Sequence, residues 1–167
     1  SDIAIFNHGI FTKIINNTVK YNEEDGIKIA SDGARSSISS NNLVDNEGKS
    51  IIILAKNIAI ESNTIDADSS EIAISILNAN FASIENNTIE GGNLGIKVQN
   101  STSAFIYNNT IKSNSGYGIQ VLINSESARV KYNQLTDNED NAIVISSSNL
   151  TEVYNNTIKE NAGYGFA

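Results

Sequence analysis

Aromatic and cationic side chains recur at a fixed spacing in the C-terminal part of the chain. Phe105 and Tyr107 are followed 24 residues later by Arg129 and Lys131, and Tyr154 comes 23 residues after Lys131. Aromatic faces pack on sugar rings, and cations pair with uronate or sulfate groups. These five residues are therefore candidates for carbohydrate binding. Exposed rings and cations also pair across neighbouring strands, so ordinary surface packing is the alternative.

Acidic residues gather in other segments of the chain. Asp66, Asp68, Asp137 and Asp140 are the candidates for a calcium site, because calcium prefers several oxygen ligands. None of their segments has the spacing of an EF-hand. A solvated acidic edge that prevents aggregation is the simpler interpretation. The sequence therefore predicts no cofactor, with calcium as the alternative.

Residues suited to acid–base or nucleophilic chemistry are few. His8 is the only histidine and the chain has no cysteine, so a thiolate metal site is excluded. A zinc site or a histidine-based triad would need partners that the sequence does not supply, and His8 is interpreted as a turn residue. Glu61 and Glu85 would lie about 4.8 Å apart on adjacent coils, near the spacing of retaining glycosidases, but any stack of acids offers such pairs. No catalytic residue is assigned.

The elements that position these residues follow from one repeated asparagine. The gaps between successive copies are 22 to 24 residues, and each copy has an aliphatic residue three positions before it and another two positions after it. A fixed period of this length indicates a solenoid. We expect this asparagine to form a left-handed bend, with its amide bonded to the equivalent amide of the next coil. The column contains Asn17, Asn41, Asn63, Asn87, Asn109, Asn133 and Asn156.

Each interval contains three short alternating segments rich in β-branched residues, which predicts three strands per coil. The third segment of each coil carries an alternating aliphatic pair. This pair is Ile3 and Ile5 in the first coil and Ile72 and Ile74 in the fourth coil. The fold class is therefore all-β: a parallel β-helix of about seven coils of 22–24 residues. The residues between the members of each pair would face outward: Ala4, Lys28, Ile52, Ala73, Lys97, Gln120 and Val144.

The repeat resembles the right-handed parallel β-helix proteins, the pectate-lyase-like superfold. The carriers are Asn-Asn-Thr-Ile at 86–89, 108–111 and 155–158, and Gly-Ile-x-Ile/Val at 26–29, 95–98 and 118–121. The resemblance implies a right-handed, single-stranded β-helix and an extracellular or cell-surface protein that acts on or binds polysaccharides. It would place a lyase site on the outward column of the Gly-Ile-x-Ile strands, where there is no arginine. Lys28 and Lys97 could act there as bases only when deprotonated, which exposed lysines rarely are.

Composition narrows the function further. The net charge of −8 argues against a nucleic-acid partner, and no stretch has the length of a membrane span. We expect one β-helix domain over residues 1–167, a segment of a longer solenoid, because no capping element is visible. Uncapped coils favour end-to-end self-association. The expected function is a non-catalytic scaffold or carbohydrate-binding module. The alternatives are a calcium-dependent polysaccharide lyase or epimerase segment and an engineered repeat protein.

Overall fold

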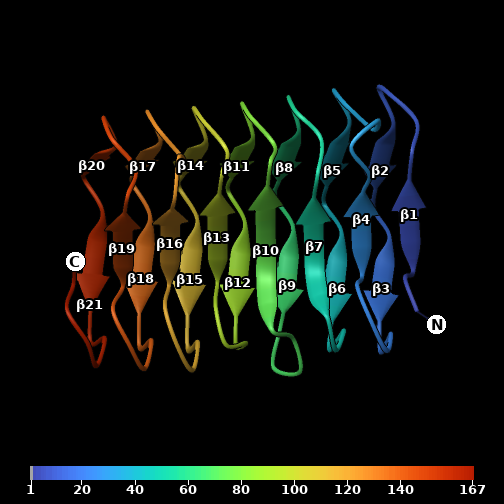
Figure 1. Cartoon of the computed structure of the whole chain (residues 1–167). Coiled ribbons are helices and arrows are strands. Elements are labelled where there is room, and N and C mark those ends of the chain that lie inside the picture. Colours follow the sequence, from blue (N-terminus) through green and yellow to red (C-terminus); the bar gives the residue numbers. More distant parts are fainter. Residues whose placement is uncertain (1) are drawn as a thin grey trace.

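The computed structural model describes residues 2–167, which form 21 strands and no helix. The strands wind into successive coils that lie side by side from the N-terminus to the C-terminus (Figure 1). All pairing is parallel and joins each strand to its equivalent in the next coil, so the coils stack at about 4.8 Å. This confirms the predicted parallel β-helix of about seven coils. None of the described residues belongs to a helix that could span a membrane.

Three seven-stranded sheets form the sides of the solenoid. Sheet A carries the alternating aliphatic pairs and contains β1 (Ile5–Asn7), β4 (Ile27–Ile29), β7 (Lys49–Ile53), β10 (Ile72–Leu77), β13 (Ile96–Gln99), β16 (Ile119–Leu122) and β19 (Ile143–Ser146). Sheet B precedes the asparagine column and contains β2 (Lys13–Ile15), β5 (Ser37–Ser39), β8 (Ala59–Glu61), β11 (Ser83–Glu85), β14 (Phe105–Tyr107), β17 (Arg129–Lys131) and β20 (Glu152–Tyr154). Sheet C follows that column and contains β3 (Thr18–Lys20), β6 (Asn42–Val44), β9 (Thr64–Asp66), β12 (Thr88–Glu90), β15 (Thr110–Lys112), β18 (Gln134–Thr136) and β21 (Thr157–Lys159).

Aliphatic side chains from all three sheets fill the interior. In sheet B the central residue of each strand points inward, and Ile60, Ile84 and Ile106 are completely buried. Its two neighbours in each strand consequently point outward. Burial of each such side chain stabilises the fold by about 1.5–3 kcal/mol, so the aliphatic column is the main source of stability.

The asparagine column forms a continuous hydrogen-bonded ladder. Each member from Asn17 to Asn133 donates its backbone N–H and its Nδ2 to the Oδ1 of the next asparagine, at 2.9–3.0 Å. Asn87 Nδ2 also donates to the carbonyl of Ile60 at 2.9 Å. These bonds satisfy polar groups that would otherwise be buried without partners.

The expected left-handed bend at the ladder asparagine is wrong by one residue. The residue before each ladder asparagine has the positive φ, as in Asn86 (57°) and Asn108 (52°). The ladder residue follows the bend and directs its amide inward, while the exposed residue before it absorbs the turn. Asparagine suits the exposed position because it tolerates a positive φ.

A second ladder, five residues after the first, is interrupted in the middle of the solenoid. Asn22 bonds to Asn46 at 2.7 Å, and Asn114 bonds to Asn138 at 2.7 Å. Gly92 occupies this position in the coil before Asn114 and has no side-chain amide to donate. As a result, the buried Oδ1 of Asn114 has no hydrogen-bond partner in the described structure.

The predicted register of sheet A is wrong in two coils. Ile5 pairs with Ile27, so the first inward pair is Ile5 and Asn7 rather than Ile3 and Ile5. In the fourth coil Ile74 pairs with Ile51, which makes the pair Ile74 and Ile76. In the fourth coil the aliphatics continue for an extra step, from Ile72 to Ile76, and in the first coil an asparagine, Asn7, occupies an inward position. The aliphatic pattern alone therefore does not fix the register at either place. The outward residues are therefore Phe6 instead of Ala4 and Ser75 instead of Ala73.

Candidate functional site

Three neighbouring strands of sheet B bring the five predicted carbohydrate-binding residues together. In the parallel register Phe105 lies beside Arg129, Tyr107 beside Lys131, and Lys131 beside Tyr154. Because Ile106 points into the core, both of its neighbours face solvent. We define the aromatic-cation face as Phe105, Tyr107, Arg129, Lys131, Tyr132 and Tyr154.

Ring contacts run through the whole aromatic-cation face. The rings of Phe105 and Tyr107 are stacked, with centroids 5.5 Å apart and planes at 10°. Tyr107 contacts Tyr132 edge-on at 5.4 Å, and Tyr132 contacts Tyr154 edge-on at 6.3 Å. Offset and edge-on contacts at these distances are attractive and hold the rings in place.

Lys131 lies at the centre of these rings. Its Nζ is 4.8 Å from the centroid of Phe105, 5.8 Å from that of Tyr107 and 5.5 Å from that of Tyr154. Within residues 2–167 it forms no ion pair, whereas Arg129 lies 3.4 Å from a carboxylate oxygen of Glu152. Among these residues the ammonium of Lys131 thus contacts ring faces and no carboxylate, and it remains available to an incoming anion.

Tyr132 was not predicted as part of this site. It occupies the exposed bend position before ladder residue Asn133 and has φ 59°. Elsewhere in this column the residue is asparagine or serine, so a tyrosine there departs from the repeat. This departure is visible in the sequence. It was not used because the bend was expected at Asn133 and not at the residue before it.

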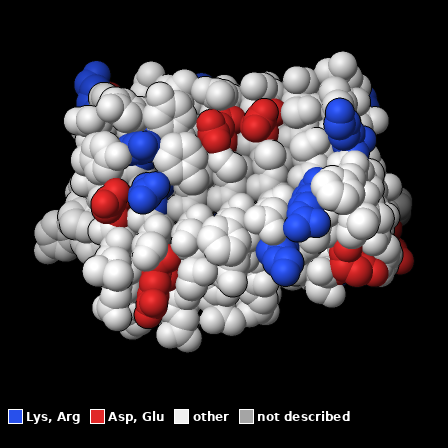
Figure 2. All heavy atoms as spheres, turned by 90° about the horizontal axis from the view of Figure 1, so that it is seen from above, with Lys and Arg blue, Asp and Glu red and all other residues white. Residues whose placement is uncertain are grey.

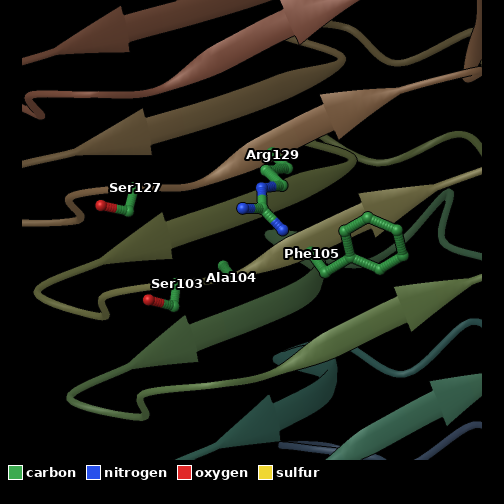
Figure 3. Close-up of a pocket in the computed structure, with 5 residues that line it drawn as sticks. All are labelled: Ser103, Ala104, Phe105, Ser127 and Arg129. Atoms are coloured by element: carbon green, nitrogen blue, oxygen red, sulfur yellow. The ribbon is translucent and has the colours of Figure 1, made fainter.

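A depression of about 360 Å³ adjoins the aromatic-cation face. It lies where β14 and β17 begin, with the Phe105 ring and the Arg129 guanidinium on one side and two serines on the other (Figure 3). The lining residues are Ser103, Ala104, Phe105, Ser127 and Arg129. A polar rim next to an aromatic surface is suited to a hydroxylated ring.

Charge is dispersed over the neighbouring surface. Seen from above, where the connections from sheet A to sheet B lie, basic and acidic side chains are interspersed among a majority of neutral ones (Figure 2). Among the described residues no extended basic surface is visible on that side.

The proposed calcium ligands do not assemble into a metal-binding group. Residues 2–167 contain no cluster of three His, Cys, Asp or Glu side chains able to hold a metal ion. Asp66 has a pKa raised above its ordinary value, chiefly by burial and further by the charges of Asp68, Asp45 and Glu90, against a lowering hydrogen bond from the Asp68 backbone. Asp140 accepts a hydrogen bond from the N–H of Asn141 at 2.7 Å. Asp66 is the last residue of β9, and Asp68, Asp137 and Asp140 lie in the turns that follow sheet C strands.

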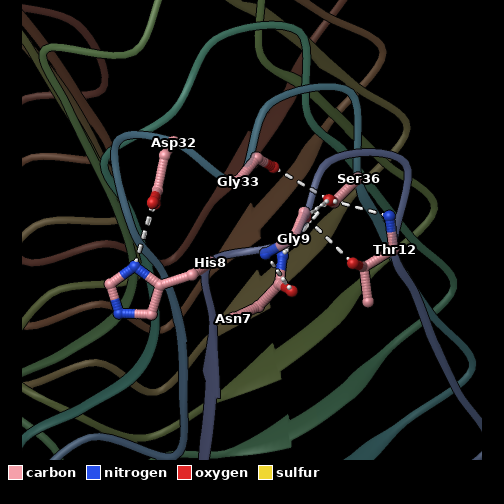
Figure 4. A network of polar contacts seen from close by, with 7 residues as sticks. All are labelled: Asn7, His8, Gly9, Thr12, Asp32, Gly33 and Ser36. Atoms are coloured by element: carbon pink, nitrogen blue, oxygen red, sulfur yellow. Dashed lines mark hydrogen bonds and ion pairs between the residues drawn. The ribbon is translucent and has the colours of Figure 1, made fainter.

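His8 has a partner that sequence reasoning did not find. Its Nδ1 lies 3.0 Å from Oδ1 of Asp32 in the next coil, and both side chains are about 60% exposed. The adjoining turn is braced by Ser36, whose hydroxyl donates to the Gly33 carbonyl at 2.8 Å and accepts from the N–H of Thr12 at 3.1 Å (Figure 4). Asp32 lies 24 residues after His8, which is one period of the repeat. This spacing was the sequence signal that the two residues are in neighbouring coils.

Of the other acid–base candidates, Lys28 lies near this pair, and Glu61, Glu85 and Lys97 lie elsewhere. Lys28 Nζ lies over the ring of Phe6 at 5.4 Å, and that ring contacts His8 at 4.3 Å. Glu61 and Glu85 are direct neighbours in sheet B, as expected, and Glu85 accepts a hydrogen bond from Ser83 in its own strand. Lys97 lies three coils beyond Lys28 in sheet A.

Comparison with known families agrees with the architecture. Residues 32–167 match the model of the right handed beta helix region. The chain belongs to this right-handed β-helix family. Among curated proteins, none has a significantly matching sequence.

Two solved structures similar in fold to this right-handed β-helix protein are polysaccharide epimerases. It is similar to the periplasmic alginate epimerase AlgG, with a TM-score of 0.62 and 18% identity over 84% of this chain and 40% of that one. It is also similar to the A-module of the Azotobacter vinelandii mannuronan C-5 epimerase AlgE6, with a TM-score of 0.56 and 13% identity over 92% of this chain and 58% of that one. The chain thus spans only part of each relative, and at these identities the likeness shows the fold alone.

Proposed function

We propose that this right-handed β-helix is a non-catalytic scaffold whose aromatic-cation face binds acidic polysaccharides. The observation that carries the proposal is the position of Lys131, whose ammonium lies within 4.8–5.8 Å of three ring centroids. Rings around a cation offer apolar surface to a sugar ring and a charge to its carboxylate within the same few ångströms.

The form of the site favours a polymer over a small molecule. The aromatic-cation face spans three adjacent strands of a flat sheet, and its depression is open and not an enclosed cavity. Small-molecule sites are usually concave and bury most of the ligand. A surface that spans three coils instead gives several weak contacts to an extended chain, and their sum supplies the affinity.

The relatives support this substrate class and a location outside the cytoplasm. Both structures named above are alginate-modifying proteins, and one is described as periplasmic. Alginate is an acidic polysaccharide, which is the class that a ring-enclosed lysine would recognise. We accordingly propose an extracellular or cell-surface role in which the β-helix is the rigid support for the face.

Affinity electrophoresis in gels containing pectate, alginate or hyaluronan tests the proposal. The wild-type chain should be retarded by at least one polymer, and Tyr107→Ala and Lys131→Ala should each restore most of the free mobility. Lys20→Ala is the matched control, because Lys20 is an exposed lysine that contacts a single ring, Tyr21, on sheet C. Equal retardation of the wild type and all variants would refute binding at the aromatic-cation face. No retardation of the wild type by any polymer would refute the binding role itself.

The enzymatic alternative rests on the His8–Asp32 pair together with the epimerase relatives. A histidine held by a carboxylate is suited to act as a general base. Removal of the C5 proton of a uronate by His8, followed by delivery of a proton from solvent to the opposite face, would invert C5 and leave a solvent proton there. Departure of the C4 oxygen with the sugar attached to it would instead cleave the chain and leave a C4–C5 double bond.

Epimerisation and chain cleavage are measured by different assays. Deuterium incorporation at C5 of polymannuronate in heavy water reports epimerisation, and absorbance at 235 nm reports unsaturated products of cleavage. Both should be measured with and without calcium, and with His8→Gln. Activity that is lost in His8→Gln would establish the enzymatic alternative, and its absence from all wild-type samples would leave the binding role.

A further inference from the structure

A second depression, which we call the amide groove, lies at the turns that lead from sheet A to sheet B. It measures about 460 Å³, and three successive coils contribute two side chains each. The lining residues are Asn78, Asn80, Asn100, Thr102, Asn124 and Glu126. The function proposed above does not use it.

The amide groove is continuous with the aromatic-cation face. Thr102 lines the groove and the next residue, Ser103, lines the other depression; Glu126 and Ser127 are related in the same way. That other depression reaches Phe105. A ligand lying on the rings can thus extend over the serine rim into the groove without crossing another coil.

Backbone geometry holds the asparagines of the groove in place while leaving hydrogen-bonding groups free. Asn78, Asn100 and Asn124 all have positive φ, between 50° and 54°. Asn100 Nδ2 donates to Asn78 Oδ1, and Asn80 Oδ1 accepts from the N–H of Thr102 at 2.9 Å. Asn124 N–H donates to the Ser147 carbonyl at 2.9 Å, but within residues 2–167 the Asn80 Nδ2 and the Asn124 side-chain amide have no hydrogen-bond partner, so they are available to a ligand.

The charge of the amide groove differs from that of the aromatic-cation face. No Lys or Arg lines the groove, and its one ionisable residue is Glu126, which is exposed. Amides and a hydroxyl donate to and accept from sugar hydroxyl and acetamido groups. A uronate carboxylate there would meet Glu126 with no cation to offset the repulsion.

We propose, on the basis of the binding role above, that the two surfaces form one extended site for a heteropolysaccharide. An acidic unit lies over Lys131 and the rings, and a neutral, hydroxyl-rich unit occupies the amide groove. The groove is therefore the part of the site that selects mixed acidic and neutral polymers over polymers made only of uronic acid.

Titration calorimetry with defined oligosaccharides tests this assignment. The probes are hyaluronan octasaccharide and disaccharide, in which acidic and neutral units alternate, and an octamer of galacturonic acid. Asn80→Ala/Asn124→Ala should weaken octasaccharide binding about tenfold, the effect of losing two hydrogen bonds, and leave the disaccharide unchanged. Glu126→Gln should raise affinity for the uronate octamer severalfold and not for hyaluronan.

A matched control variant distinguishes failure of the binding role from failure of the extended site. Asn42→Ala/Gln134→Ala removes two exposed amides from sheet C and should bind like the wild type. If the wild type binds neither octamer, the binding role itself fails. If the wild type binds and Tyr107→Ala does not, but the groove variants match the control, the extended site alone is refuted. Circular dichroism melting of each variant confirms that it is folded.

Discussion

The ammonium of Lys131 lies 4.8 Å from the ring centroid of Phe105, which belongs to the preceding coil. The contact exists because the repeat places the two residues in adjacent outward columns, so a side chain from one coil reaches the ring of another. The preceding strands β5, β8 and β11 have small and acidic residues at these outward positions, and no rings. The aromatic-cation face is therefore confined to the C-terminal coils.

Binding of an acidic polysaccharide should depend on salt through Lys131. Raising the ionic strength from about 0.01 to about 1 M shortens the Debye length from about 30 to about 3 Å. Wild-type affinity for polygalacturonate should therefore fall with salt. Lys131→Gln should be about tenfold weaker at low salt and less salt-dependent, as measured by biolayer interferometry. Lys20→Gln should follow the wild type, and identical salt curves for all three proteins would contradict the role of Lys131.

The asparagine ladder should dominate local stability in the middle of the rod. Asn87→Ala leaves the buried N–H of Asn63 and the carbonyl of Ile60 without side-chain partners, at about 1–3 kcal/mol for each unpaired group. Urea unfolding should show a markedly lower midpoint. Thr88→Ala, an exposed change in the next residue, should remain within about 0.5 kcal/mol of the wild type. Similar midpoints for the two variants would show that the ladder amides are not needed for stability.

Asp66 should make stability decrease as pH rises through the acid range. Its folded pKa is raised above the unfolded value, mainly by burial, so the folded state binds the proton more tightly. The unfolded state then binds fewer protons, and the free energy of unfolding falls as pH increases past the unfolded pKa. Asp66→Asn should therefore raise the thermal midpoint at pH 7 and not at pH 3. Exposed Glu47→Gln is the control, and an equal shift at both pH values would exclude this cause.

The ladder has a direction, and we propose that this favours head-to-tail stacking of the 167-residue polypeptide. Its bonds run from the N–H groups of one asparagine to the Oδ1 of the next, from Asn17 toward Asn156. A second copy could extend the ladder, with Asn156 donating to its Asn17. Light scattering should show a mass that grows with concentration, and Ile158→Lys in the last coil should suppress the growth. A constant monomer mass for the wild type would contradict stacking.

Much of the fold could be read from the sequence because its signals repeat. Seven copies of one asparagine fixed the coil length and the ladder, and alternation around Ile106 or Val130 fixed which residues face outward. Where aliphatics continue beyond one pair, as at Ile72 to Ile76, alternation admits two registers, and only pairing with the adjacent strands decides between them. The bend was misplaced because adjacent asparagines such as Asn86 and Asn87 are equally good turn residues by type.

The site was partly accessible for the same reason. Equivalent positions of successive repeats lie side by side, so the repeat predicts that Phe105, Tyr107 and Lys131 are neighbours. Tyr132 and the His8–Asp32 pair lie in turns. The repeat places these residues in neighbouring coils, but whether their side chains meet depends on turn φ values that periodicity does not specify. The residues of the amide groove lie nine and seven positions before three successive ladder asparagines, so the repeat does align them. The sequence alone gives no sign that these exposed turn residues line a depression.

The most direct test of the aromatic-cation face is a residue-resolved NMR titration of the protein with a short acidic oligosaccharide. Addition of the oligosaccharide should shift the backbone amides of residues 105–107, 129–132 and 154, with line broadening at Lys131, and should leave sheet C unperturbed. Perturbation centred on His8 and the outward residues of sheet A, or none at millimolar ligand, would contradict binding at the aromatic-cation face.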